Sequence, residues 1–115
     1  MSNEVLCYNT PMEDVKKTIV KFTKDRDWDQ FHSPTNLAKS IAIESGELLE
    51  CFQWNDNFNK EDVCDELADV IIYAILLADK LDVNLEEIIM KKMEKNSKKY
   101  PIEKAKGNSK KYTEL

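Results

Sequence analysis

The segment from Lys60 to Leu81 reads KEDVCDELADVIIYAILLADKL and has the apolar spacing of a long helix. Its apolar residues recur every three or four positions, and neither Gly nor Pro interrupts them. The longest apolar run, Val70 to Ala78, is much shorter than the roughly 20 residues that a membrane crossing requires. We therefore expect a helix in the core of a soluble domain and no membrane span.

The remainder of the chain predicts three more helices. Met12–Arg26 spaces its apolar residues helically and predicts the first helix, and a short polar stretch follows at Asp27–His32. Ser33 as N-cap, with Pro34 at the first helical position, predicts a second helix that runs to about Trp54.

The fourth helix is expected after Asn84, because Asn84 with Glu87 three residues later is typical of a helix start. This helix should extend towards Tyr100, where Pro101 disfavours continuation. We expect residues 102–115 to form an irregular basic tail.

Composition favours an all-α fold. The chain has 115 residues but only two Gly and three Pro, too few for the turns of a sandwich or barrel. Turn-forming residues at 55–59 predict the loop between the second and third helices. Because there is no internal repeat or linker, we expect a single domain over residues 1–115, with residues 1–11 as an N-terminal extension. The expected protomer is of the four-helix bundle type.

Charge is unevenly distributed along the chain. Residues 1–90 hold 8 Lys+Arg and 19 Asp+Glu, a net charge of −11, whereas residues 91–115 hold nine Lys and three Glu, a net charge of +6. The acidic body would repel the phosphates of duplex nucleic acid, so we expect no such partner. The basic end is either solvated or supplies phosphate contacts to a small ligand.

Three cysteines bear on the compartment: Cys7, Cys51 and Cys64. Their odd number and the absence of CxxC spacing favour free thiols in a reducing compartment over disulfides or a zinc site. The residues Met1–Glu4 lack the basic start of a secretory signal. We expect a cytoplasmic protein.

Four acidic residues fall within or beside the apolar stripes of the second and third helices. Because successive helical residues rotate by about 100°, Glu44 lies within about 20° of Leu37, in the apolar face, and Glu47 borders that face. On the next helix, Glu66 lies inside the stripe and Asp69 at its edge. Two helices therefore each present a pair of acids to the side that should face a partner.

Buried carboxylates need a positive charge nearby, because each unpaired buried ion is costly. Lysines are badly placed for this: Lys39 points about 140° away from Glu44, and Lys60 and Lys80 lie near the ends of the third helix. A divalent cation is the better counter-charge, and oxygen ligands without nearby His suit Mg²⁺ or Mn²⁺. The alternative is that the helices are shorter or rotated and the acids face water.

Two neighbours of these acids lead to separate expectations. Glu50 rotates about 120° from Glu44, so we expect it to be solvated. Gly46 costs about 1 kcal/mol relative to Ala inside a helix. It therefore predicts the close approach of another helix or a ligand.

The acidic motifs resemble those of a known family. ESGELLE at Glu44–Glu50, followed by ELADV at Glu66–Val70, is similar to the ExxE…ExxD signature of the MazG-like, all-α nucleoside triphosphate pyrophosphohydrolases. The blocks that resemble the dCTP pyrophosphatase branch are RDWDQFH at 26–32, FQW at 52–54, KYP at 99–101 and KYTEL at 111–115. This resemblance covers the chain from about residue 12 to its end.

The resemblance implies Mg²⁺-dependent hydrolysis between the α and β phosphates of a nucleotide, which yields a nucleoside monophosphate and pyrophosphate. The expected substrate is dCTP or a related pyrimidine deoxynucleotide, and the expected role is sanitation of the nucleotide pool. The implied metal ligands and catalytic residues are Glu44, Glu47, Glu66 and Asp69.

The resemblance also implies nucleotide contacts by Trp28, His32, Trp54 and Tyr73. The chemistry of these residues agrees, because tryptophans can stack on a base and Tyr73 lies about 20° from Glu66 around its helix. One departure bears on base preference: this chain has Ile19 where the branch has a His in its first helix.

Other roles follow from position on a helix. Glu47, at the edge of the stripe, is expected to orient or deprotonate the attacking water. Lys92, Asn96 and Tyr100 recur every four residues on the fourth helix. They either meet the phosphates of the substrate or form a solvated polar face.

The flank of the third helix formed by Ile71, Ile72 and Ile75 lies about 120° or more from Glu66 and is also apolar. A helix that is apolar all round is buried on all sides. We therefore expect a homo-oligomer, a dimer or tetramer, with this flank in an interface.

Three alternatives to a dCTP-hydrolysing enzyme remain. The chain could hydrolyse dUTP or a broad set of triphosphates, or it could be a helical interaction module whose acids hold a structural ion. The third alternative, a di-iron carboxylate bundle, is disfavoured, because it requires Glu-x-x-His on two helices and this chain has one His.

Overall fold

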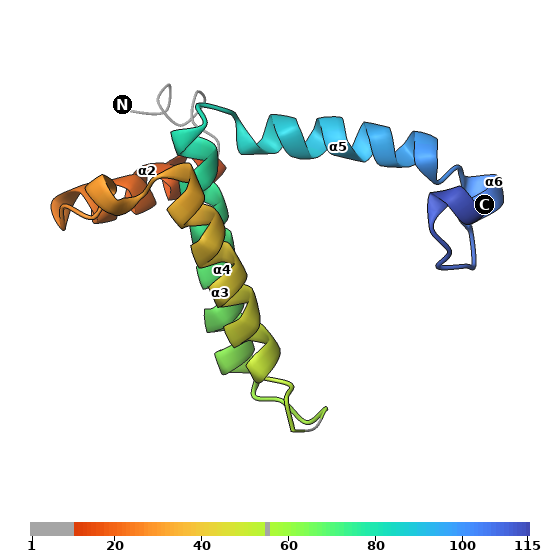
Figure 1. The fold of residues 1–115 in the computed structure, drawn as a ribbon, viewed down its shortest axis with the longest axis horizontal. Coiled ribbons are helices and arrows are strands. Elements are labelled where there is room, and N and C mark those ends of the chain that lie inside the picture. The colour runs from red at the N-terminus through yellow and green to blue at the C-terminus, as the bar shows by residue number, and fades with distance from the viewer. Residues whose placement is uncertain (1–10, 55) are drawn as a thin grey trace, which may run out of the picture. The chain divides into compact units, whose positions relative to one another are not determined.

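The computed structural model describes residues 11–54 and 56–115 (Figure 1). All regular secondary structure in these residues is α-helix or 3₁₀-helix, which confirms the all-α fold. The chain divides into two compact units, the first ending at Asp82 and the second spanning Val83–Leu115. The single domain over residues 1–115 stays a prediction. Most of the predicted N-terminal extension, including Cys7, lies outside the described residues.

Helix α2 spans Pro11–Asp25, close to the predicted Met12–Arg26. It ends where the Trp28 N–H donates to the Thr23 carbonyl at 2.9 Å and the Asp27 N–H donates to the Lys24 carbonyl at 3.0 Å. Asp27 adopts a left-handed backbone with φ 57°, in a helix-ending turn where Gly is the usual residue. The chain therefore turns sharply before its next element.

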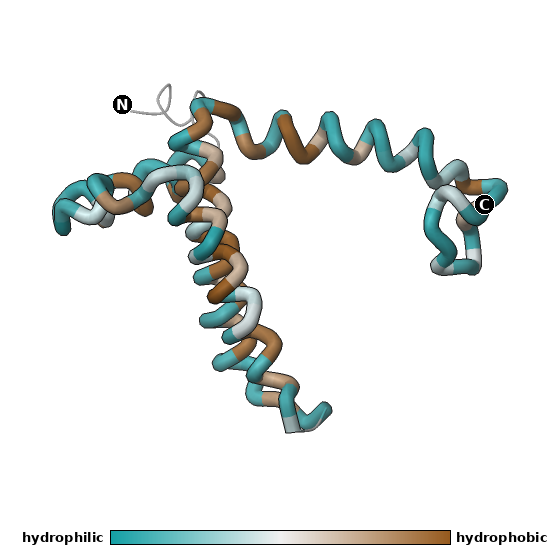
Figure 2. Tube along the Cα trace, viewed as in Figure 1, coloured by the Kyte–Doolittle hydropathy of each residue, from teal (hydrophilic) through white to brown (hydrophobic). Residues whose placement is uncertain are grey.

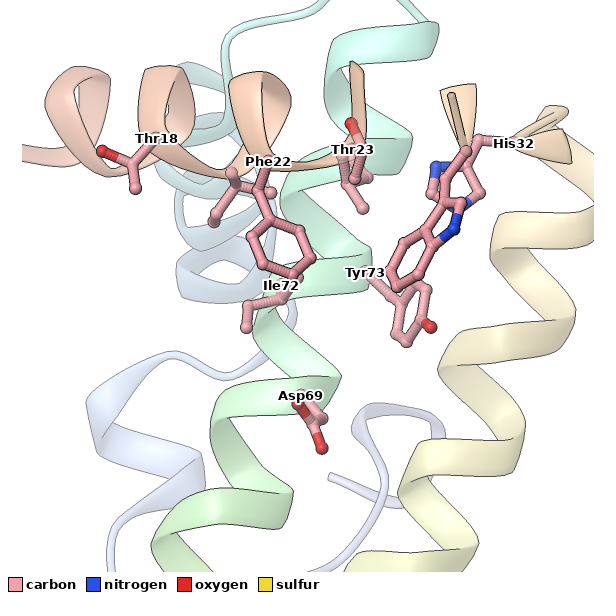
Figure 3. A pocket seen from close by; sticks show the side chains of 10 residues that line it. Thr18, Phe22, Thr23, His32, Asp69, Ile72 and Tyr73 are labelled. Carbon is pink, nitrogen blue, oxygen red and sulfur yellow. The ribbon is translucent and has the colours of Figure 1, made fainter. Parts of the chain in front are cut away.

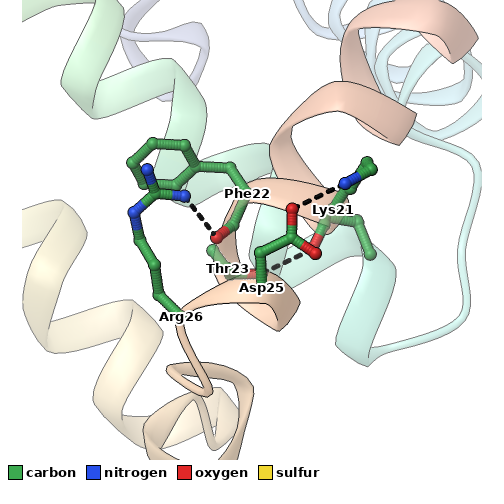
Figure 4. Close-up of polar contacts among 6 residues, drawn as sticks. Lys21, Phe22, Thr23, Asp25 and Arg26 are labelled. Carbon is green, nitrogen blue, oxygen red and sulfur yellow. Dashed lines mark hydrogen bonds and ion pairs between the residues drawn. The ribbon is translucent and has the colours of Figure 1, made fainter.

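A cation–aromatic stack covers this turn (Figure 4). The Arg26 guanidinium lies 3.5 Å from the centroid of the Phe22 ring, and Arg26 Nη1 donates to the Phe22 carbonyl at 3.1 Å. The Phe22 ring in turn meets the Trp28 ring edge to face, with centroids 5.7 Å apart. The stack orders the residues on either side of the turn.

The 3₁₀-helix η1 (Asp29–Phe31) leads into α3, which spans Pro34–Glu50. Ser33 is the N-cap, and its hydroxyl accepts from the Asn36 N–H at 3.1 Å, as predicted. The prediction that this helix reaches Trp54 is wrong. The amides after Glu50 donate to carbonyls only three residues back, so the chain tightens into turns before Trp54.

Helix α4 spans Lys60–Lys80, which confirms the third predicted helix. The side chain of Asn59 caps it by accepting from the Asp62 N–H at 3.1 Å. Figure 1 shows α3 and α4 side by side along their length, with α2 across the end of the pair where α3 begins and α4 ends. Apolar residues run along this pair in Figure 2. The most buried apolar residues are Leu37, Ile75, Leu76 and Ala78.

The isoleucine flank of α4 is only partly available to a second protomer. Ile75 is 3% exposed and belongs to the core of the first unit, so its predicted place in an interface is wrong. Ile72 is half-buried and lines a cavity with residues of α2. Ile71 alone of the three is exposed, at 44%. Because α2 crosses α4, it covers part of the isoleucine flank that we predicted to contact a second protomer.

The second unit contains α5 (Leu85–Lys99), which agrees with the predicted fourth helix. Its N-cap Asn84 accepts from the Glu87 N–H at 2.9 Å. The prediction that residues 102–115 form an irregular tail is wrong in part, because the tail contains α6 (Ile102–Ala105) and a 3₁₀-helix, η2 (Tyr112–Glu114).

Aromatic contacts hold the tail within this unit. The rings of Tyr100 and Tyr112 meet edge to face with centroids 6.1 Å apart, and Lys99 Nζ lies 4.8 Å from the Tyr112 ring centroid.

In the described part of the chain, none of the helices has the length and apolarity needed to traverse a bilayer.

Candidate metal centre and adjoining cavity

Three carboxylates meet where α3 packs against α4. Glu44 from α3 and Glu66 and Asp69 from α4 each offer one oxygen, and these three atoms lie within 4.8 Å of one another. All three residues are half-buried. Helical phasing brings them together, because the apolar stripe that contains each acid also packs against the neighbouring helix.

Two oxygens of this cluster lack hydrogen-bond partners. Glu44 Oε2 and Glu66 Oε2 are buried, and neither has a partner among the described residues. Burial, and then the nearby carboxylates of Glu47, Asp69 and Glu66, raise the pKa of Glu44 to about 7. Burial and the charges of Glu47 and Asp69 also raise the pKa of Glu66. The cluster therefore has strong acceptors and needs a positive charge.

Glu47 lies beside this cluster, on the exposed side of α3. Its carboxylate is close enough to Glu44 and Glu66 that its charge adds to burial in raising the pKa of both. Lys80, the lysine at the end of α4, pairs instead with Asp29 at 2.8 Å. A donor set made of carboxylate oxygens fits a hard divalent cation such as Mg²⁺ or Mn²⁺.

A cavity of about 330 Å³ adjoins the cluster, and Asp69 belongs to both. Figure 3 shows the side chains that line this cavity, Asp69 among them. Helix α2 forms one wall, α4 forms another, and the turn between α2 and α3 contributes its aromatic residues. Most of the lining is apolar. The lining residues are Thr18, Ile19, Phe22, Thr23, Trp28, His32, Asp69, Ile72, Tyr73 and Leu76.

The polar groups of the cavity differ in availability. The hydroxyls of Thr18 and Thr23 donate to carbonyls of their own helix at 3.1 and 2.9 Å. His32 Nδ1 is buried and has no hydrogen-bond partner in the described structure. The His32 ring meets the Tyr73 ring edge to face at 6.4 Å. Burial, followed by the charges of Glu44, Asp69 and Glu47, raises the pKa of Tyr73.

The two tryptophans differ in their relation to the cavity. Trp28 lines it and is 47% exposed, so part of its ring surface is available to a ligand. Trp54 is 85% exposed and is not among the lining residues. The early end of α3 accounts for this difference, because Trp54 follows the helix instead of continuing its face.

The other predicted contacts lie in the second unit. Lys92 and Asn96 are on α5, and Tyr100 follows its last residue and packs on Tyr112. Their proposed role towards phosphates stays a prediction. The predicted close approach of another helix to Gly46 is wrong for the described residues, since a Cβ built there would meet no atom of another helix within 4 Å.

Sequence reasoning missed the α2 wall of the cavity and the pair between Lys80 and Asp29. Thr18 and Phe22 lie four residues apart and resemble ordinary members of a core stripe. The partners of the ion pair are 51 residues apart, so no local pattern could indicate it.

The sequence model of the MazG-like family matches residues 39–115 of this chain. The chain belongs to the MazG-like family. This confirms the resemblance inferred from the acidic motifs.

Individual proteins are also similar to this chain. The chain is 37% identical over 93 residues to dCTP pyrophosphatase 1 of Mus musculus and of Homo sapiens. Each match covers 72% of this chain and 55% of the relative, so the chain spans about half the length of the curated relatives it matches. The crystal structure of a pyrophosphatase from Archaeoglobus fulgidus is similar with a TM-score of 0.76 and 40% identity, over 82% of this chain and 95% of that one.

Proposed function

We propose that the protein is a Mg²⁺-dependent nucleoside triphosphate pyrophosphohydrolase that acts on dCTP or a related pyrimidine deoxynucleotide. The single observation that carries this proposal is the carboxylate cluster of Glu44, Glu66 and Asp69 with its two unpartnered buried oxygens. Family membership supports the reaction class, and the names of the mammalian relatives support the substrate. Such activity would serve to sanitise the nucleotide pool.

In this proposal, Glu44, Glu66 and Asp69 hold the cation, and Glu47 completes the set from the exposed side of α3. A bound divalent cation supplies the positive charge that lets an acidic site accept a triphosphate and that stabilises charge developing on phosphate oxygens. Mn²⁺ can replace Mg²⁺, because both take oxygen ligands. All four carboxylates must be ionised for this role.

Glu47 is proposed to take up the proton of the attacking water, since it is the acid of the four that is exposed. Water oxygen joins the α phosphorus, the bond to the bridging oxygen breaks, and pyrophosphate leaves. The products are a nucleoside monophosphate and pyrophosphate. Asp69, shared by the cluster and the cavity, links the metal end of the site to its base end.

The cavity is proposed to hold the base. Trp28 would stack on the base, while His32 Nδ1 would hydrogen bond to its polar edge. Tyr73 would contact the ligand between the base and the acids. Trp54 remains a proposed contact, with an exposed ring that is free to meet a ligand.

The basic second unit is proposed to supply phosphate contacts through Lys92, Asn96 and Tyr100. The chain is proposed to form a homodimer or homotetramer, with the exposed Ile71 in the interface. The free thiols of Cys51 and Cys64 support a cytoplasmic location.

A broader range of bases, including that of dUTP, is the second candidate. One observation favours it: the lining of the cavity is mostly apolar. Among the described lining residues, His32 Nδ1 is the one buried side-chain nitrogen or oxygen without a hydrogen-bond partner. A cavity with few polar groups distinguishes poorly between bases of similar shape.

The test is pyrophosphate release from a panel of dNTPs and dUTP, with and without Mg²⁺. We expect release from dCTP that requires Mg²⁺, together with the nucleoside monophosphate. Equal release from all pyrimidines would favour the broader enzyme. Mg²⁺ binding without turnover of any nucleotide would contradict the proposal and favour a structural ion in an interaction module.

A further inference from the structure

One ion pair ties the turn between α2 and α3 to the end of α4. Lys80 Nζ donates to Asp29 Oδ1 at 2.8 Å, and the two residues are 51 positions apart. The Lys80 side chain is 27% exposed and that of Asp29 is 41% exposed, so solvent screens the pair only in part.

Asp29 lies in the segment that carries the aromatic groups of the cavity. It begins η1, directly after Trp28 and three residues before His32, and both neighbours line the cavity. The turn has one ring contact with α4, in which His32 meets Tyr73 edge to face at 6.4 Å. Its contact with α3 is short-range, since the Asn36 side chain donates to the Phe31 carbonyl at 3.0 Å. The ion pair adds a charged attachment to α4 at the start of the turn, beside this ring contact.

Lys80 continues the face of α4 that lines the cavity. Ile72, Tyr73 and Leu76 precede it by eight, seven and four residues, the spacing of a single helical face. The lysine therefore lies one turn beyond the cavity lining. From that position it reaches the turn that closes the same cavity.

We propose that Lys80 is a positioning residue, whose pair with Asp29 holds the Trp28–His32 turn against α4 and so sets the width of the base cavity. This inference rests on the proposed function for its kinetic consequence. The pair touches neither the carboxylate cluster nor Glu47 in the described structure. Loss of the pair should therefore loosen the base end of the site and leave the metal end intact.

The kinetic test compares Lys80→Met with the wild type, using dCTP and Mg²⁺. We expect KM to rise about twofold to fivefold, the range for losing one partly screened ion pair, while kcat changes less than about 1.5-fold. Asp29→Asn should reproduce the effect, and Lys80→Arg should restore KM. The double variant should be no worse than either single one.

Lys16→Met is the matched control. Lys16 pairs with Asp79 at 3.4 Å, at the same end of α4, but it comes from α2 and not from the turn. We expect its KM to equal that of the wild type. An equal rise in KM for Lys16→Met, or an unchanged KM for Lys80→Met, would overturn the proposal.

A spectroscopic test is independent of turnover. Trp28 is the one tryptophan left in a Trp54→Phe background. In that background, Lys80→Met should increase acrylamide quenching of Trp28, and Lys80→Arg should not. Unchanged quenching would overturn the positioning role, whereas a wild type without pyrophosphate release would contradict the proposed function alone.

Discussion

Glu44 on α3 and Glu66 on α4 each bury a carboxylate oxygen, and the described structure offers neither oxygen a hydrogen-bond partner. Both lie in the cluster whose ligand atoms are within 4.8 Å of one another. Burial of like charges disfavours the folded state, and mutual repulsion adds to that cost. The metal-free fold therefore tolerates an arrangement that a bound cation would stabilise.

Glu66→Gln should affect stability and turnover in opposite directions. The substitution removes one of the facing charges, so the metal-free protein should unfold at a higher temperature. It also removes a proposed metal ligand, so Mg²⁺-dependent pyrophosphate release should fall at least about a hundredfold. Calorimetry and a pyrophosphate assay measure the two effects.

Glu50→Gln is the control for this prediction. Glu50 is exposed at the end of α3, outside the cluster. Its turnover should stay close to that of the wild type. A lower melting temperature together with full activity in Glu66→Gln would remove that residue from the site.

The pKa of Glu44 predicts a pH dependence. In the folded chain this pKa is about 7, against an ordinary value of 4.5, so the folded state retains a proton that the unfolded state has lost. Stability of the metal-free protein should thus fall as pH rises from about 4.5 to 7, as far as Glu44 contributes. Chemical denaturation across this range measures the effect.

Cation binding should be linked to the same proton. Mg²⁺ requires the ionised carboxylate, so its binding at pH 7 should release protons, and the release should decline at higher pH. Titration calorimetry in buffers of different ionisation enthalpy counts these protons. Proton release independent of pH would show that Glu44 is not a ligand.

Trp28→Ala should weaken nucleotide binding more than Trp54→Ala does. Trp28 lines the cavity, and loss of a stacking contact costs about 1 to 3 kcal/mol. Trp54 is outside that lining, so its removal should have the smaller effect. Dissociation constants of dCTP in Ca²⁺ buffer provide the comparison, and the reverse order would move the base site.

Substitutions of Asp27 test the turn after α2. Its φ of 57° suits Asn nearly as well as Asp, so Asp27→Asn should leave the unfolding free energy almost unchanged. A β-branched side chain fits this backbone poorly, so Asp27→Val should lose about 1–2 kcal/mol. Urea denaturation distinguishes them, and equal stability would show that the turn relaxes.

Helix starts could be predicted from the sequence because single side chains mark them. Ser33 and Asn84 accept the backbone N–H groups that a capping residue should satisfy. Helix ends were less predictable. α3 stops at Glu50 without a Gly or Pro, and α2 uses Asp27 in a left-handed conformation that usually indicates Gly.

The candidate site also has a part that the sequence predicts and a part that it does not. The grouping of Glu44 and Glu66 follows from helical phasing on two consecutive helices, which periodicity can give. The cavity depends on α2 crossing α4, a tertiary relationship that also buries Ile75. No pattern within one helix contains that information.

All four acids lie on two consecutive helices joined only by residues 51–59. The rings of Phe52 and Phe58, with centroids 4.9 Å apart, bring the two sides of this connection together. Lengthening a flexible loop costs only about 0.6 kcal/mol for each doubling. Insertions into this connection would leave the helical register of the acids unchanged. The loop between α3 and α4 can therefore change in length during evolution while the four acids keep their positions.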